Sequence, residues 1–118
     1  MMPRVSVILP THNRPVLLAE ALTSLLTQTF TDWEVLIVDD ASTTPVTIDE
    51  VDDKRIHILR HSSSQGGAAA KSTGIKGATT DILAFMDDDD LYAPQYLERS
   101  LGILDRNPNL DVVFMGVS

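Results

Sequence analysis

The feature of this sequence that most restricts its fold is a series of short apolar runs, several of which stop at polar or acidic residues. Three of these runs cover Val5 to Leu9, Trp33 to Val38 and Asp81 to Met86. Their length and their aliphatic composition are typical of strands that are buried on both faces of a sheet. A fourth run, Arg55 to Arg60, alternates in polarity and predicts a strand nearer the sheet edge. A fifth strand is predicted at 111–117.

Helical patterns separate these runs. Pro15 suits the first turn of a helix, and the leucines and alanines after it recur at three- and four-residue spacing, which gives one apolar face. The glycine-rich stretch Gln65 to Ala78 predicts a second helix, and a third is expected from Pro94 to Asn107. Alternating strands and helices require crossover connections, so we expect an α/β fold with a mostly parallel sheet and helices on both faces. The 118 residues suffice for a single domain, 1–118.

Polar residues follow three of the predicted strands. They are Thr11 to Asn13, the pair Asp39 and Asp40, and Asp87 to Asp90. Ligands of open parallel sheets bind beyond the carboxyl ends of the strands, so the fold would bring these residues to the ligand side. His57 and His61, in or beside the edge strand, are expected at the surface instead.

The four adjacent aspartates, Asp87 to Asp90, repel one another unless they fan out into water or share a cation. Mg²⁺ or Mn²⁺ would fit, because these ions take one or two protein carboxylates together with phosphate oxygens and water. The run joins a buried strand directly and is followed by Tyr92 and Pro94. We therefore favour a cation whose remaining ligands come from a nucleoside diphosphate, and a solvated acidic turn is the alternative.

The composition excludes several classes of function. The 17 acidic and 9 basic side chains give a formal charge of −8, which argues against a protein that holds nucleic acid or anionic lipid by general electrostatics. Without cysteine, the chain forms neither disulfides nor thiolate metal sites. The apolar run near Met1 is too short for a signal segment or a membrane span, so we expect a soluble cytoplasmic domain.

Other sites with clustered acids fit the sequence less well. A calcium loop beginning at Asp87 would place Glu98 at its twelfth position, but Leu91 and Tyr92 stand where an oxygen ligand and a glycine are needed. A phospho-receiver domain needs its acidic pair after the first strand, whereas the pair here follows the second. A phosphatase with an aspartate nucleophile at a strand end remains a third option.

Four stretches of the chain form a specific sequence pattern when they are taken together, because of their order and spacing. They are residues 5–14, 25–42, 66–78 and 82–90, followed by Pro94, Leu97 and Glu98. Together they resemble the N-terminal half of a family 2 glycosyltransferase with the Rossmann-like GT-A fold. The resemblance runs over nearly the whole chain and implies a nucleotide-sugar-binding subdomain over 1–118.

The resemblance implies roles for single residues toward the nucleotide-sugar. His12 lies where the family often has tyrosine, in the segment that runs along the nucleotide. Asp40 matches the acid that binds the edge of the base, and Asp39 supports it. Lys71 stands where arginine is more usual, so it keeps the charge but lacks the bidentate fork. The residues assigned to the nucleotide-sugar are Pro10, Thr11, His12, Arg14, Asp39, Asp40, Lys71, Asp87 and Asp88.

The resemblance also implies a metal site of the DxD type. Asp89 is the expected ligand of Mg²⁺ or Mn²⁺, and Asp88 is expected on the ribose or the metal. Asp87 and Asp90 would assist them, which gives Asp88, Asp89 and Asp90 as the expected metal set.

The implied activity is transfer of a sugar from a nucleotide-sugar donor, expected to be UDP-linked, to the hydroxyl of an unidentified acceptor, with assistance from the metal. In inverting members of the family, a carboxylate that deprotonates the acceptor comes from a later part of the chain. We therefore expect these residues to be truncated before the acceptor-binding half, with the general base beyond Ser118, and to be inactive alone. A non-catalytic nucleotide-sugar-binding fragment is the alternative.

Overall fold

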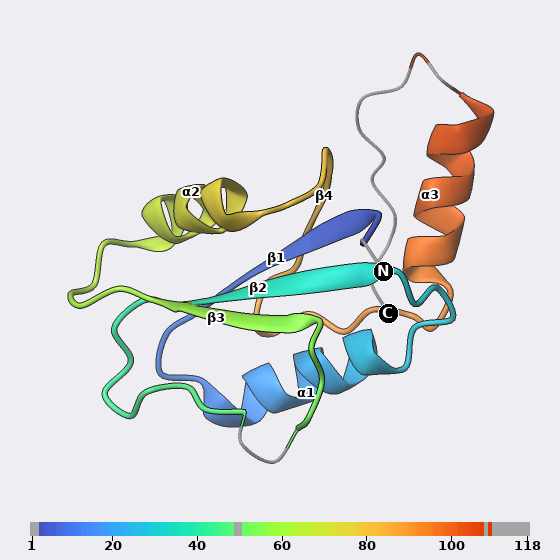
Figure 1. Ribbon diagram of the computed structural model, residues 1–118. Coiled ribbons are helices and arrows are strands. Elements are labelled where there is room, and N and C mark those ends of the chain that lie inside the picture. Colours follow the sequence, from blue (N-terminus) through green and yellow to red (C-terminus); the bar gives the residue numbers. More distant parts are fainter. Residues whose placement is uncertain (1–2, 49–50, 108, 110–118) are drawn as a thin grey trace.

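The computed structural model describes residues 3–48, 51–107 and 109, and these are built around one four-stranded sheet (Figure 1). The strands are β1 (Val5–Thr11), β2 (Trp33–Asp39), β3 (Ile56–Arg60) and β4 (Ile82–Phe85), in the spatial order β3-β2-β1-β4. Every pairing is parallel. The predicted α/β fold is confirmed, and β3 lies at a sheet edge as its alternating pattern indicated. The strand predicted at 111–117 lies outside the described residues.

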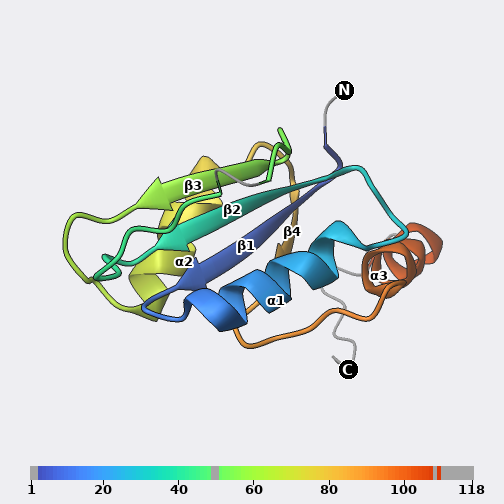
Figure 2. The ribbon, with the colours of Figure 1, turned by 90° about the horizontal axis from the view of Figure 1, so that it is seen from below.

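The register of the sheet brings the ends of its strands to one edge. Thr11 of β1 pairs with Asp39 of β2, which in turn pairs with Arg60 of β3, and Figure 2 shows these three strands pointing the same way. β4 ends earlier, because its last residue, Phe85, pairs with Ile8. The chain after β4 must therefore continue for three more residues before it is level with Thr11. That position falls within the run of aspartates.

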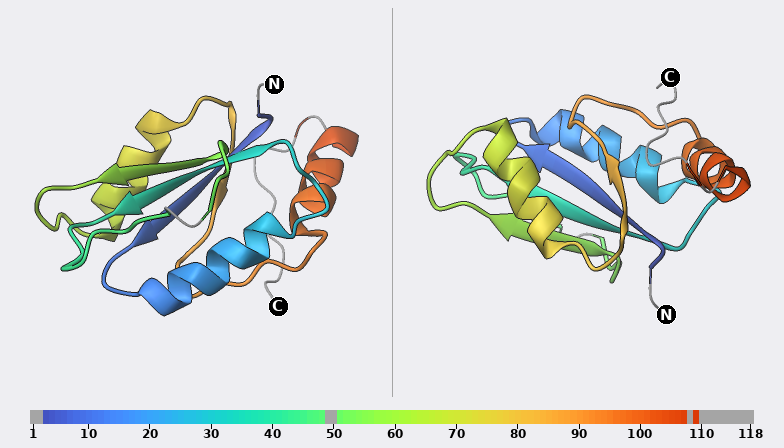
Figure 3. Two further views of the ribbon diagram at one scale, coloured as in Figure 1. Left: turned by 60° about the horizontal axis from the view of Figure 1, so that its bottom comes forward. Right: turned by 90° about the horizontal axis from the view of Figure 1, so that it is seen from above.

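Helices cover both faces of the sheet. α1 (Pro15–Leu26) lies against one face and α2 (Gly67–Gly77) against the other (Figure 3). α3 (Tyr96–Arg106) begins two residues after the predicted start and lies at the end of the sheet where β1 and β2 begin (Figure 1). Among the described helices, which have at most 12 residues, none combines the length and the apolar character of a membrane span.

The segment between β4 and α3 is held along α1. The Tyr92 hydroxyl donates to the backbone carbonyl of Phe85 at 2.7 Å, and the Tyr92 N–H donates to the hydroxyl of Ser24 at 3.1 Å. Gln28 donates from Nε2 to the carbonyl of Ala93 at 2.7 Å. Because these three hydrogen bonds are partly buried, they fix where the acidic run leaves the sheet.

Small residues let α2 approach the sheet closely. Gly74 faces β1 and β2, where a Cβ would lie 2.5 Å from Cγ2 of Ile8 and 3.3 Å from Cγ2 of Val38. Ala70, one turn earlier, is only 1% exposed. A Cβ at this contact would force Ile8 or the helix to shift. The close approach sets the position of the amino end of α2, which lies next to the carboxyl edge of the sheet.

We expect the substitution Gly74→Ala to lower the free energy of unfolding by about 1–3 kcal/mol, because the added methyl overpacks the contact with Ile8. Urea denaturation followed by circular dichroism measures this change. Gly102→Ala in α3 is the matched control: its Cβ would meet only the flexible end of Arg106, at 3.4 Å. This control should gain up to about 1 kcal/mol from helix propensity. A Gly74→Ala protein as stable as the wild type would contradict the close packing.

Candidate functional site

A cavity of about 380 Å³ opens at the carboxyl edge of the sheet. It is formed by the ends of β1 and β2, the first turn of α2 and the segment that follows β4. Its lining includes most of the residues predicted to bind a nucleotide-sugar. The lining residues are Pro10, Thr11, His12, Arg14, Asp40, Gly67, Ala70, Asp87, Asp88 and Asp89.

Three predicted residues lie outside that lining. Asp39 is completely buried behind the edge of the sheet, and Asp90 closes the acidic turn described below. Lys71 is exposed on α2. The structure therefore brings the ends of β1 and β2 and the segment after β4 to one cavity, whereas Lys71 lies outside its lining.

A second, larger cavity of about 710 Å³ lies between α1 and the loop after β2. Leu18, Leu22 and Ile37 form part of its apolar lining, and several threonines lie around them. No aspartate or glutamate of the described chain contributes to it, and among the predicted site residues only Thr11 and Arg14 do. We assign the functional site to the smaller cavity, because that is where the chemically active groups converge.

Asp39 organises the loop that follows β2. Its carboxylate accepts hydrogen bonds from the N–H groups of Ser42 at 2.9 Å and Val46 at 3.0 Å, and from the guanidinium of Arg60. Burial alone would raise the pKa of Asp39, but these hydrogen bonds together with the Arg60 charge outweigh it, so the pKa is lowered. Asp39 is thus an ionised structural group that faces the 42–46 loop.

Asp40 holds the other side of the cavity in place. Its carboxylate accepts hydrogen bonds from the N–H groups of Gln65 at 2.8 Å and Gly66 at 3.0 Å, from Ser64 Oγ at 3.0 Å and from His61 Nδ1 at 2.8 Å. The bond from Gln65, followed by that from His61, keeps the pKa of Asp40 far below its usual range. One carboxylate therefore fixes the whole 61–66 loop and the entry into α2.

His61 is a site residue that the sequence reasoning placed wrongly. It was expected at the surface, but it is only 8% exposed and lies between Asp40 and α2. Its Nε2 is 2.7 Å from the hydroxyl of Thr73. The signal that could have found it is positional: His61 directly follows β3, as Asp40 directly follows β2, and the two strands pair in parallel with Asp39 opposite Arg60.

The turn after β1 is bound to the turn after β2. Nδ1 of His12 lies 2.6 Å from the carbonyl oxygen of Asp40. The N–H of Asn13 donates to Ser42 Oγ at 2.9 Å, and Asn13 Oδ1 accepts from the N–H of Thr43 at 2.7 Å. Asn13 was expected on the ligand side without an assigned role and Ser42 was not predicted, yet both hold the turn that carries His12.

Both turns also contain a residue in the left-handed backbone region. Asn13 has φ 54° and Ala41 has φ 59°. Asparagine adopts this conformation more readily than most residues, whereas for alanine it is uncommon. The hydrogen bonds of the two turns therefore hold Ala41 in a conformation that its side chain disfavours, directly after Asp40.

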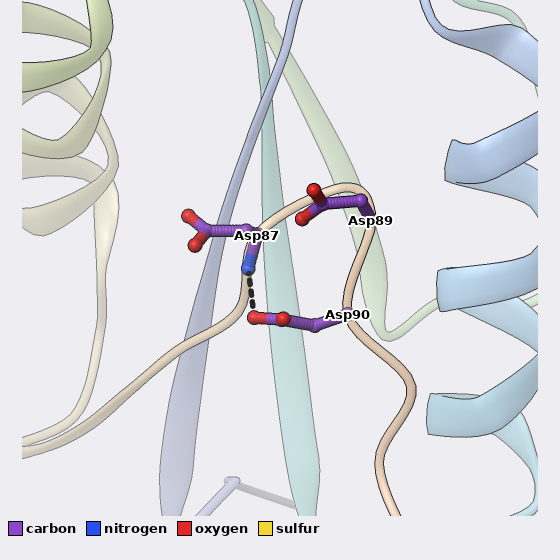
Figure 4. Close-up of side chains that lie close together, drawn as sticks. All are labelled: Asp87, Asp89 and Asp90. Atoms are coloured by element: carbon purple, nitrogen blue, oxygen red, sulfur yellow. Dashed lines mark hydrogen bonds between the residues drawn. The ribbon is translucent and has the colours of Figure 1, made fainter. Parts of the chain in front are cut away.

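The aspartates after β4 form a tight turn. The N–H of Asp90 donates to the carbonyl of Asp87 at 3.0 Å, and the N–H of Asp87 donates to the Asp90 carboxylate at 2.9 Å. One carboxylate oxygen from each of Asp87, Asp89 and Asp90 lies within 4.8 Å of the others (Figure 4). That spacing is close to the roughly 4 Å between opposite oxygen ligands of Mg²⁺. The hard oxygen donors of this turn fit Mg²⁺ or Mn²⁺.

Asp88 differs from its neighbours. It is only 7% exposed, it accepts from Thr11 Oγ1 at 2.9 Å, and Arg14 lies 3.2 Å from its second oxygen. The expected metal set contained Asp88, but in the structure the side chain that joins Asp89 and Asp90 is Asp87. Asp88 instead joins the acidic turn to the end of β1.

The comparisons with known proteins agree with this geometry. The family model for glycosyl transferase family 2 matches residues 6–117. The chain belongs to this family. The described sheet and helices have the GT-A fold that was predicted. A structural neighbour is S. aureus TarS 1–349 in complex with UDP, with a TM-score of 0.79 and 28% identity. The match covers 89% of this chain and 33% of that chain.

Two further proteins are similar to this chain. The E. coli UDP-Glc:alpha-D-GlcNAc-diphosphoundecaprenol beta-1,3-glucosyltransferase WfgD is 33% identical over 105 residues, which are 87% of this chain and 42% of that protein. The mannosyltransferase PcManGT from Pyrobaculum calidifontis, solved with GDP-Man and Mn²⁺, has a TM-score of 0.76 and 29% identity over 88% of this chain and 33% of that one. The chain spans less than half the length of these proteins.

We expect Asp40→Asn to lower the free energy of unfolding by about 2–3 kcal/mol at pH 7, because the amide cannot accept all four hydrogen bonds. The folded pKa of Asp40 is lowered, so its contribution is present above the unfolded value of about 3.9 and is lost as the pH falls toward the folded value. The stability difference between wild type and variant should therefore shrink below about pH 4. Urea denaturation at several pH values measures it.

Asp52→Asn is the control for this experiment, because Asp52 is exposed and loses the same charge. It should change the stability by less than about 0.5 kcal/mol at any pH. Equal stability of the Asp40→Asn protein and the wild type at pH 7 would show that the Asp40 bonds do not hold the loop.

Proposed function

We propose that this domain binds a UDP-sugar in the cavity at the carboxyl edge and takes part in transferring the sugar to an acceptor hydroxyl. The observation that carries the proposal is the convergence of the β1 end, Asp40 and the acidic turn on that one cavity. Family membership supports it, as do the UDP bound to TarS and the UDP-Glc in the name of WfgD. The acceptor is a second substrate, whose chemistry the described residues do not select.

The base of the nucleotide is proposed to lie between His12 and Asp40. The His12 ring is exposed at the cavity and is held by the Asp40 carbonyl, so it can stack on a base. The four hydrogen bonds to Asp40 fill the four lone-pair positions of a carboxylate. A hydrogen-bond donor on the base would therefore have to replace one of the four present donors. The donor replaced most easily is the side-chain hydroxyl of Ser64, at 3.0 Å, because the others include the backbone N–H groups of Gln65 and Gly66.

The diphosphate is proposed to lie toward the acidic turn. Asp89, together with Asp87 and Asp90, would hold Mg²⁺ or Mn²⁺, as the Mn²⁺ in PcManGT suggests for the family. The ion would neutralise charge that develops on the departing diphosphate. Gly67 and Ala70 line the opposite wall with little side-chain bulk, and the amino end of α2 favours negative charge there.

A second candidate is nucleotide-sugar binding without turnover by these 118 residues. The carboxylates of the described site are occupied by structural contacts or by the proposed metal role, so none of them is assigned as the base for an acceptor hydroxyl. Release of UDP from UDP-glucose separates the candidates. Turnover by the 118-residue chain supports the first, whereas UDP binding without turnover supports the second for this chain.

We expect Asp89→Asn to abolish the part of UDP binding that depends on Mn²⁺ while leaving the fold intact, because Asp89 is exposed on its turn and makes no hydrogen bond within it. Isothermal titration with UDP, with Mn²⁺ and with EDTA, measures both parts. The loss should be at least about tenfold in Kd, since a charged ligand of the ion is removed.

Asp81→Asn is the matched control, because Asp81 is exposed immediately before β4, at the opposite end of that strand. It should leave both affinities unchanged. If the Asp89→Asn protein keeps the metal-dependent affinity of the wild type, Asp89 is not a metal ligand. If neither protein binds UDP at all, the proposed function fails.

A further inference from the structure

Arg14 lies between the end of β1 and the start of α1, and its side chain reaches the acidic turn. Its guanidinium Nη1 is 3.2 Å from Asp88 Oδ1 and 3.6 Å from Asp89 Oδ2. The first distance is a hydrogen bond, whereas the second is only an electrostatic contact. Among the described lysines and arginines, Arg14 alone lines the cavity.

The two aspartates are held very differently. The Asp88 side chain is 10% exposed, and its other oxygen is bound by Thr11, so Asp88 is fixed from both sides. The Asp89 side chain is 56% exposed, and its contact with Arg14 is the longer of the two, at 3.6 Å. Arg14 itself is 52% exposed, so its contact with Asp89 is screened by solvent and weak.

We propose that Arg14 is a built-in cation of this site that competes with a divalent ion for Asp89. Without an ion, its positive charge relieves the repulsion among the four adjacent carboxylates. When an ion is present, the guanidinium keeps its hydrogen bond to Asp88 and gives up the longer contact with Asp89. Arg14 thereby sets how tightly the empty site holds a metal. The inference rests on the metal part of the proposed function, and Arg14 acts as a positioning residue.

Titration of the protein with Mn²⁺ alone, without nucleotide, tests this directly, with free Mn²⁺ followed by electron paramagnetic resonance. Arg14→Gln removes the charge but keeps an amide that can donate to Asp88. We expect this variant to bind Mn²⁺ about two- to tenfold more tightly than the wild type, a size that fits a partly exposed charge pair. Arg14→Lys keeps the charge and should stay within about twofold of the wild type.

Arg99→Gln is the control, since it makes the same change in net charge from an exposed position on α3. It should leave the Mn²⁺ affinity unchanged. Unchanged or weaker binding by Arg14→Gln overturns the proposal, and so does an equal gain in the Arg99 variant. Absence of Mn²⁺ binding in all the proteins overturns it too, but a UDP titration in EDTA would still show whether the nucleotide site exists.

Discussion

The parallel register between β1 and its neighbours is the constraint on which the site depends. Asp40 donates its N–H to the carbonyl of Thr11 at 2.9 Å, so the turns after β1 and β2 begin side by side. On the other side of β1, Met86 donates to the carbonyl of Ile8 at 3.0 Å, and two residues later Asp88 meets the Thr11 hydroxyl. A slip of one residue in either pairing would turn every side chain of the slipped strand to the opposite face and separate these groups.

The two acidic segments of the chain have different physical roles. Asp39 and Asp40 are buried, accept several hydrogen bonds each and have lowered pKa values. Their ionised carboxylates therefore stabilise the loops that donate these bonds. Asp87 and Asp89 are exposed and have few partners within the described chain, which leaves their charge available to a ligand. Asp88 lies between these cases, because it is buried like the first pair but belongs to the second segment. The site thus consists of a rigid wall around Asp40 and an open acidic turn opposite it.

Much of the fold followed from the sequence because it depends on local patterns. Apolar runs of five or six residues predicted the strands, and the residues after them marked the ligand edge. What the sequence could not supply were contacts between strands and the directions of side chains in turns. His61 was expected in water but is bound to Asp40, and Asp87, expected only to assist, lies with Asp89 and Asp90. Both differences arise from register and turn geometry, which determine the direction of a side chain and are not contained in residue type. The site roles taken from the family remain predictions.

The measurement that tests the central claim most directly is a titration of ¹⁵N-labelled protein with UDP and diamagnetic Mg²⁺, followed by amide NMR. The account predicts that the largest shifts occur at the ends of β1 and β2, in the first turn of α2 and in the 87–89 turn, which surround the smaller cavity. The larger cavity beside α1 provides the internal comparison. Shifts confined to α1 and the 43–48 loop, with the acidic turn unaffected, would contradict the account.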